Sequence, residues 1–162
     1  MNGKPYFLLK IEGIEGETAD PKYPGYFEID SWSWGVSMAS TMQSGGGMAA
    51  GKANLSDFSF TKPSDKSTPK LMEACATGVK YPSAIAIARK QGQTSGELEE
   101  FAKYTFTDLV ISRYSVSGSG EIPAEQLSVS FGKVDFEYDE KKLGESQGWQ
   151  KAGFDSKTNA VT

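Results

Sequence analysis

The chain has 162 residues, a formal net charge of −4, a pI near 5.0, one cysteine and no histidine. The length predicts one domain over residues 1–162, and 12% aromatic residues with 18 glycines favour a β-rich fold. The acidic balance argues against nucleic acid or an anionic membrane as partner, and the missing histidine excludes Ser–His or Cys–His catalytic pairs and imidazole metal ligands.

The first apolar run, residues 5–11, has the length of a strand and is interrupted by Lys10. It is too short for the core of a signal peptide, and no small-residue cleavage pattern follows it. No segment reaches the length of a membrane-spanning helix. We therefore expect a chain that is made as a soluble cytoplasmic protein without membrane insertion. Any export from the cell would use a route without a cleaved signal peptide.

Residues 26–38 form the next predicted strand, and their apolar pattern changes phase halfway. Phe27 and Ile29 occupy odd positions, whereas Trp32 and the apolar residues after it occupy even ones. Because side chains of a strand alternate between two faces, both sets can share one face only if a residue is inserted. A β-bulge or a sharp bend is therefore predicted near Asp30.

The stretch SWSWG, residues 31–35, places two indoles two positions apart. Trp32 and Trp34 are predicted to anchor the core, where burial of their large area contributes most. Ser31 and Ser33 must then face the other side of the strand. That side either meets ordinary solvent on a monomer or lines something larger.

Residues 39–51, ASTMQSGGGMAAG, are predicted to form a long uncharged loop that is rich in glycine and methionine. Residues 46–52 match the GxxxxGK pattern of phosphate-binding loops. That chemistry needs a Ser or Thr after the lysine and a helix that begins there, but Ala53 follows and the next residues read as a strand. A nucleotide site is therefore rejected, and no cofactor is predicted.

The change of phase recurs in residues 52–62, 103–116 and 125–138. Long strands with repeated slips are typical of a strongly bent sheet that wraps a closed or nearly closed barrel. Phe58 and Phe60 follow the slip in the first of these segments and are predicted to be further core anchors.

One short helix is predicted between Ser67 and Gly78. Ser67 offers a hydroxyl cap, Pro69 suits the first turn, and Gly78 suits the left-handed residue past the end. The apolar residues on one side predict that the helix packs on the side of the barrel. Cys75 within it is predicted to be a small buried hydrophobe, because a nucleophilic cysteine would need a histidine.

Three carboxylates alternate near the end of the last long strand: Asp135, Glu137 and Asp139. Glycoside hydrolysis needs two carboxylates from separated elements that flank a cleft. Alternating neighbours opposite the core are more often a solvated or edge-protecting stripe. No catalytic residue and no metal site is predicted, and the chain after about residue 156 is expected to be a polar tail.

Six short motifs follow one another along the chain: WSWG at 32–35, GK at 51–52, DFSFTK at 57–62, DKSTPKLM at 65–72, ACATG at 74–78 and EQLS at 125–128. In this order they resemble the haemolysin-coregulated protein (Hcp) family, which forms the inner tube of the bacterial type VI secretion system. The resemblance extends from about Tyr6 to Asp155 and covers nearly the whole chain.

The resemblance implies a mainly β fold, a bent-strand β-barrel with one short α-helix packed on its side. It implies homohexameric rings that stack into a hollow tube, with a spike protein at the tip and a contractile sheath outside. Contraction of the sheath would expel the tube, so the chain would be cytoplasmic when assembled and then secreted. The resemblance further implies a structural role without enzyme activity, in which small effector proteins are carried in the lumen.

Two hypotheses about sites follow from the resemblance. Ser33, and secondarily Ser31, would line the lumen and contact effectors. The segment 39–51 would contact a neighbouring ring, because methionine adapts to irregular pockets and glycine gives the backbone freedom. The residues proposed for this contact are Met42, Gly45, Gly46, Gly47 and Met48.

Two alternatives stay open on the residues alone. A monomeric β-barrel that binds a small ligand would show a cavity lined by aromatic residues. A carboxylate-dependent hydrolase would lose its activity when one acidic pair is changed.

Overall fold

The computed structural model describes residues 5–43 and 47–162, and it describes side chains outside residues 39–51. Eleven strands and one helix make up the described part of the chain. The elements are β1 (Phe7–Ile11), β2 (Phe27–Ile29), β3 (Ser31–Ser33), β4 (Val36–Gln43), β5 (Gly47–Leu55), β6 (Phe58–Pro63), α1 (Thr68–Thr77), β7 (Lys80–Gln91), β8 (Leu98–Ser117), β9 (Ala124–Lys142), β10 (Glu145–Asp155) and β11 (Ala160–Val161).

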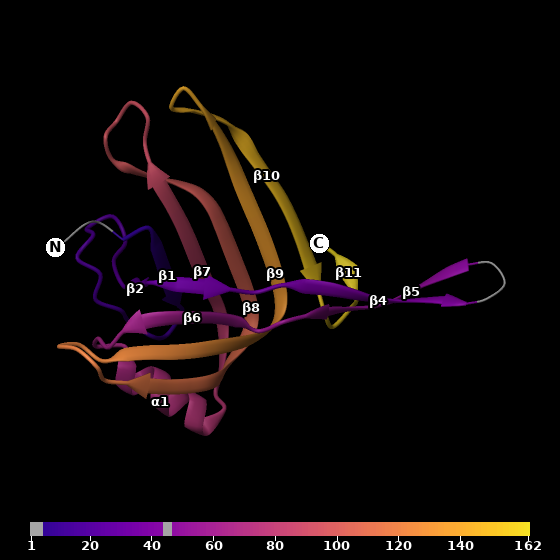
Figure 1. The fold of residues 1–162 in the computed structure, drawn as a ribbon, viewed down its shortest axis with the longest axis horizontal. Helices are drawn as coiled ribbons and strands as arrows, with labels where there is room; N and C mark the ends of the chain where they lie inside the picture. The colour runs from indigo at the N-terminus through magenta and orange to yellow at the C-terminus, as the bar shows by residue number, and fades with distance from the viewer. Residues whose placement is uncertain (1–4, 44–46) are drawn as a thin grey trace.

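One strongly bent sheet contains all the strands except β4 and β5. Its main path runs β11-β10-β9-β8-β7-β1-β2, while β6 pairs with both β9 and β3. The sheet is not closed by hydrogen bonds alone, because β2 and β3 are joined only through the chain at Asp30. Figure 1 shows β8 and β9 turning sharply, so that each contributes to two differently oriented parts of the sheet. The predicted mainly β, bent-strand, barrel-like fold with one helix is confirmed.

The predicted changes of phase coincide with interruptions of the strands. Asp30 separates β2 from β3, and two residues separate β5 from β6. The register between β8 and β9 shifts between Ile111 and Arg113. Earlier in β8, Asp108 has a positive φ of 55°. The ladder has a gap there, because Asp108 and Gly132 lie opposite each other between the pairs Thr107–Lys133 and Leu109–Phe131 without being paired. These local insertions let each long strand keep apolar side chains inside while it bends.

The helix α1 begins and ends where the sequence predicts, but Ser67 does not cap it. The backbone of Ser67 is already helical, and its hydroxyl donates to the carboxylate of Asp65 instead of to a helix amide. Gly78 has a φ of 68°, and its N–H donates to the carbonyl of Ala74 at 3.0 Å. Leu71 is buried on the inner side of the helix, which packs against β8.

The segment predicted as a loop without secondary structure forms most of an antiparallel hairpin, β4–β5. The ladder runs from the pair Val36–Leu55 to the pair Gln43–Gly47. The small residues within 39–51 give no alternating apolar pattern, yet their backbone groups pair as well as any others. The pattern therefore found residues 36–38 of β4 and 52–55 of β5 and missed the rest of both strands. Met42 pairs with Met48, and Gly45 and Gly46 lie outside the described residues. In Figure 1 the hairpin extends far from the rest of the molecule.

Aromatic rings fill the centre of the core. Phe58, Phe60 and Phe106 are buried, with exposed fractions of 1%, 2% and 1%. Trp32 and Trp34 are half-buried and pack against this cluster. The ring of Trp32 stacks on Phe58 at a centroid distance of 5.8 Å. Cys75 is half-buried, not fully buried as the sequence predicts, because it lies at the margin of the face that α1 presents to the sheet.

The C-terminal segment folds back onto the sheet. β11 pairs with the end of β10, and Lys157 forms an ion pair with Asp108 at 2.6 Å.

Among the residues that the structure describes, no helix is long and apolar enough to cross a membrane.

Candidate functional site

The outer side of β3, β6 and β9 carries a continuous set of short polar side chains. Register places Ser31 opposite Thr61 and Ser33 opposite Ser59. On the other side of β6, Ser128 of β9 pairs with Ser59 and Gln126 of β9 pairs with Thr61, so two rows of polar side chains cross the three strands. We call this surface the hydroxyl face and define it by Ser31, Ser33, Ser59, Thr61, Gln126 and Ser128.

The hydroxyl groups of this face bond to one another along the sheet. Ser31 Oγ lies 2.7 Å from Thr61 Oγ1, and Ser59 Oγ lies 2.9 Å from Ser128 Oγ. The face borders a shallow hollow of about 360 Å³. Ser31 and Ser33 are exposed on the side opposite to the two indoles, as the alternation of the strand predicts. The surface is therefore uncharged, low in relief and able to form hydrogen bonds.

Arg113 of β8 stands at the border of the hydroxyl face. It follows the register shift at Ser112 and pairs in register with Ser128. Among the described residues that line the hollow, it is the one charged side chain. The sequence interpretation missed Arg113, because its face depends on the bulge. Ser59 and Thr61 could have been found, since they alternate with Phe58 and Phe60.

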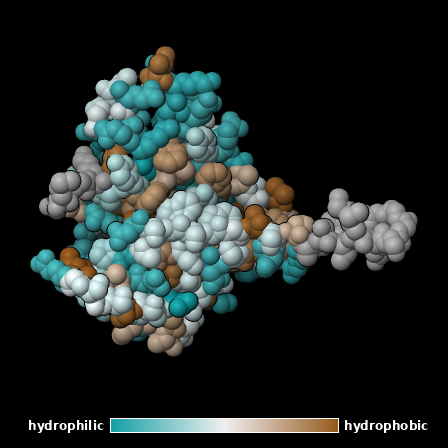
Figure 2. Space-filling model, in the orientation of Figure 1, coloured by the Kyte–Doolittle hydropathy of each residue, from teal (hydrophilic) through white to brown (hydrophobic). Residues whose placement is uncertain are grey.

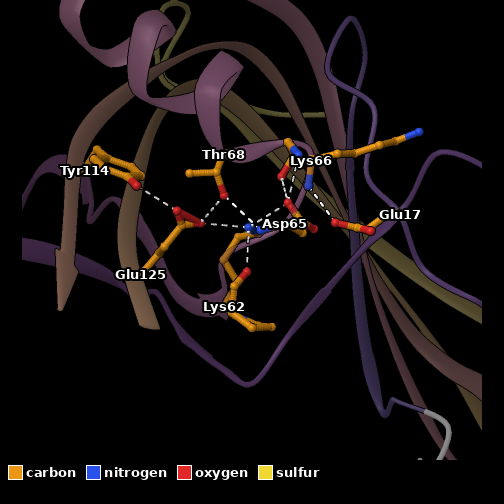
Figure 3. Close-up of polar contacts among 9 residues, drawn as sticks. Glu17, Lys62, Asp65, Lys66, Thr68, Tyr114 and Glu125 are labelled. Carbon is orange, nitrogen blue, oxygen red and sulfur yellow. Dashed lines mark hydrogen bonds and ion pairs between the residues drawn. The ribbon is translucent and has the colours of Figure 1, made fainter. Parts of the chain in front are cut away.

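A buried ion network lies directly behind the hydroxyl face (Figure 3). Lys62 and Glu125 have fully buried side chains, and Lys62 Nζ lies 2.8 Å from Glu125 Oε1. The same ammonium donates to Asp65 Oδ1 at 3.0 Å and to the carbonyl of Pro63 at 2.9 Å. Three donors of one ammonium are thus satisfied inside the protein, which offsets the large cost of burying the charge.

The network also holds the start of the helix and β8. Thr68 Oγ1 donates to Glu125 Oε1 at 3.0 Å, and the Tyr114 hydroxyl donates to Glu125 Oε2 at 2.7 Å. Burial, together with the neighbouring Glu125 carboxylate, raises the pKa of Tyr114 to about 12. Figure 3 shows these side chains converging from β6, β8, β9 and the start of α1. The sequence interpretation missed this network, because its members are far apart in the chain.

A second hollow, of about 230 Å³, lies at the base of the β4–β5 hairpin and is almost wholly apolar. Val36 at its rim is 60% exposed. The next outward position of β4, Met38, is 52% exposed. The lining residues are Trp34, Val36, Leu55, Val134, Phe136, Ala152, Gly153 and Phe154.

The three alternating carboxylates do not form a catalytic pair. Asp135 and Asp139 each approach a lysine two positions away, Lys133 at 3.5 Å and Lys141 at 2.8 Å. Asp139 is fully buried, so the prediction of a solvated stripe is wrong for this residue. The chain covers it at the register shift in β10, and the Lys141 ammonium lowers the pKa of Asp139.

The described residues also offer no phosphate loop and no group of three metal-ligating side chains. Lys52 lies inside the strand β5, where no helix N-terminus is available to face a phosphate. Figure 2 shows hydrophilic residues gathered over the upper ends of β7–β10 and residues of intermediate hydropathy across the middle of the visible face. The fold and the hydroxyl face define a barrel-like protein with an exposed, uncharged polar surface on its bent sheet.

Comparisons with known proteins give the family. Residues 8–138 match the family model described as "Type VI secretion system effector, Hcp". Protein hcp1 of Pseudomonas aeruginosa is 36% identical over 138 residues, which is 83% of each chain. The crystal structure of Hcp1 from Salmonella typhimurium is 34% identical, with a TM-score of 0.80 over 96% of this chain and 97% of that one.

A further solved structure, described as that of a type six secretion system protein, has a TM-score of 0.86 at 26% identity and covers 96% of this chain and 98% of its own. The chain belongs to the Hcp family of type VI secretion system proteins. Hcp proteins are secreted tube and effector proteins of that system.

Proposed function

We propose that this chain assembles head to tail into hexameric rings that stack into the hollow tube of a type VI secretion system. A spike protein would cap the tube, a contractile sheath would surround it, and contraction would expel it. Small effector proteins would travel in the lumen. The observation that carries the proposal is the hydroxyl face, an uncharged polar surface on a curved sheet.

The edges of this part of the sheet support the ring. β3 pairs with β6 on one side, and β8 pairs with β9 on the other. The ladder between β7 and β8 ends at the pair Lys80–Val110. Within the described residues, β3 and the last residues of β8 therefore leave one edge each without a strand partner. Unpaired edges are templates for another chain.

Pairing of β3 in one copy with the end of β8 in the next would continue the sheet from subunit to subunit. Such a contact uses two different surfaces, and repeated contacts of this kind give a ring when the rotation closes. Because the sheet is curved, the hydroxyl face of every copy would then line one channel. Ser31 and Ser33 would lie at a subunit boundary within that lining.

The β4–β5 hairpin is proposed to connect one ring to the next. It leaves the body of the molecule with Val36 and Met38 exposed at its base. Exposed apolar residues on a projecting element favour burial against another subunit. This assigns stacking to the segment that contains Met42, Gly47 and Met48, with Gly45 and Gly46 at its undescribed tip.

Imaging of the purified protein by negative stain, together with native mass spectrometry, tests the ring. Hexameric rings are expected, and a monomer at high concentration would contradict the proposal. For stacking, residues 41–49 are replaced by Asn-Gly, which closes the hairpin at the registered pair Ser40–Ala50 with a two-residue turn. The shortened chain should keep rings and lose tubes, whereas unchanged tubes would refute the stacking role.

Cargo retention is tested with Ser33→Gln. The longer amide would fill part of the hollow beside Ser59 without adding charge. Rings should persist while co-purification of effector proteins falls. Thr77→Gln is a control, because Thr77 is exposed at the end of α1, away from the hydroxyl face. Equal cargo retention by both variants would contradict a role for Ser33.

A further inference from the structure

Arg113, the cation at the border of the hydroxyl face, indicates which ligands that face binds. Arg113 is exposed and lines the hollow together with Ser33 and Ser128. All the other lining residues that the structure describes are neutral. The chain as a whole has a net charge of −4, so this cation opposes the overall sign.

The guanidinium of Arg113 is available to a ligand. Within the part of the chain that the structure describes, no carboxylate lies within ion-pair distance of it. The adjacent Ser112 hydroxyl donates to Asp57 Oδ2 at 2.7 Å, and no ion pair joins Asp57 to Arg113. Asp108, five positions before Arg113 on β8, is paired with Lys157 at 2.6 Å. Glu125 of the neighbouring strand β9 points to the opposite side and is buried with Lys62. An exposed arginine without an internal partner can form two parallel bonds to a carboxylate.

The hydroxyl groups beside Arg113 suit the same ligand. In the pair Ser59–Ser128 only one hydroxyl proton is used between the two oxygens, so the other hydroxyl can donate outward. A carboxylate seated at Arg113 would therefore find further donors in the same row. A cationic segment would find no charge partner among the described residues that line the hollow.

We propose that Arg113 makes the hydroxyl face selective for acidic segments of cargo polypeptides, with the guanidinium binding an aspartate or glutamate side chain. This rests on the proposed function, because cargo meets the face in the lumen of a ring. Arg113 would act as a specificity-determining residue, while Ser31 and Ser33 set the space available to cargo.

Binding of labelled hexaglutamate and hexaglutamine peptides, followed by fluorescence anisotropy, tests the selectivity. Hexaglutamate should bind the unmodified protein more tightly, and added salt should weaken its binding. Arg113→Gln should weaken hexaglutamate binding at least about fivefold and leave hexaglutamine unchanged. Arg113→Lys should give an intermediate affinity, because it keeps the charge and loses the planar fork.

Lys70→Gln is the matched control, since it removes the same charge from an exposed position on α1, behind the sheet. An equal loss in both variants would show an effect of net charge alone and overturn the proposal. Equal binding of the two peptides to the unmodified protein would overturn it as well. Tighter binding of a single-stranded hexanucleotide than of hexaglutamate would assign the site to phosphate and reject the carboxylate.

Native mass spectrometry of the same samples keeps the two proposals apart. Absence of rings would contradict the proposed tube. The affinities for hexaglutamate and hexaglutamine would then be compared on the monomeric subunit. Intact rings without any preference for hexaglutamate would contradict only the role of Arg113.

Discussion

Replacing Lys62 by methionine tests whether the buried ion network holds the barrel together. Methionine matches the length of the lysine stem, so the substitution removes the ammonium and little volume. Glu125 would lose its 2.8 Å partner, and Asp65 would lose its 3.0 Å partner. Both carboxylates would stay enclosed, since their side chains are 0% and 12% exposed.

The expected cost follows from that burial. Removing one member of a buried ion pair destabilises a protein by about 3–5 kcal/mol, because the remaining charge is left without compensation. Hydroxyl donors from Thr68 and Tyr114 still reach Glu125, which places Lys62→Met near the lower end of the range. In a domain of this size each kcal/mol lowers the melting temperature by about 2–4 °C, so a cost of about 3 kcal/mol gives an expected decrease of roughly 6–12 °C.

Urea unfolding followed by tryptophan fluorescence measures this cost, since Trp32 and Trp34 lie against the core. Lys66→Met is the matched control: its ammonium is 3.7 Å from Glu15, and both side chains are exposed, so the expected cost is below about 1 kcal/mol. All variants are compared at the same protein concentration, because assembly of subunits raises the apparent free energy of unfolding.

The double variant Lys62→Met/Glu125→Met completes a cycle. Since it removes both charges, it should cost less than the sum of the two single changes, with a coupling of about 1–3 kcal/mol. A cost for Lys62→Met as small as that for Lys66→Met, or strict additivity in the cycle, would refute the structural role of the network.

Two further predictions concern stability. The pKa of Tyr114 is raised from its ordinary value of 10 to about 12, so the folded state resists the ionisation that the unfolded chain undergoes. The raised pKa therefore contributes fully to the free energy of unfolding below pH 10, and this contribution is lost as the pH rises toward 12. In the unmodified protein the urea midpoint should fall over this pH range, and Tyr114→Phe should make that fall less steep. An unchanged slope would contradict the assignment. A methyl group at Gly16 would overlap the backbone and side chain of Phe27, so Gly16→Ala should destabilise the fold by about 1–3 kcal/mol. Gly118→Ala, where a methyl group meets open space, should change the midpoint little, and equal effects of the two alanines would contradict the packing.

Single-sequence reasoning found those features that a local pattern encodes. The phase change between Phe27 and Trp32 predicted the break at Asp30, and Gly78 predicted the end of α1. It also placed Ser31 and Ser33 opposite the indoles, because alternation needs only the neighbours in the chain.

Long-range features could not be found in the same way. Lys62 and Glu125 are 63 positions apart, and nothing in either local sequence indicates that both side chains are buried together. Most of the β4–β5 hairpin was missed for a different reason. The small residues within 39–51 lack a period-2 signal, and only the backbone ladder reveals that the two strands continue over residues 39–43 and 47–51.

The ion pair Lys62–Glu125 and most of the hydroxyl face lie on the same two strands, β6 and β9. The register between these strands therefore determines which side chains the face presents. Along β6, Lys62 points inward between Thr61 and Pro63, and along β9, Glu125 points inward next to Gln126. A slip of one residue between β6 and β9 would turn hydroxyl groups into the core and phenylalanines outward. It would also separate the ammonium from its carboxylate, which is costly inside the protein. Apolar packing alone tolerates many arrangements, whereas a buried ion pair has one partner at one register. The pair at 2.8 Å therefore fixes which side chains the face presents, although it lies behind that face and touches nothing outside.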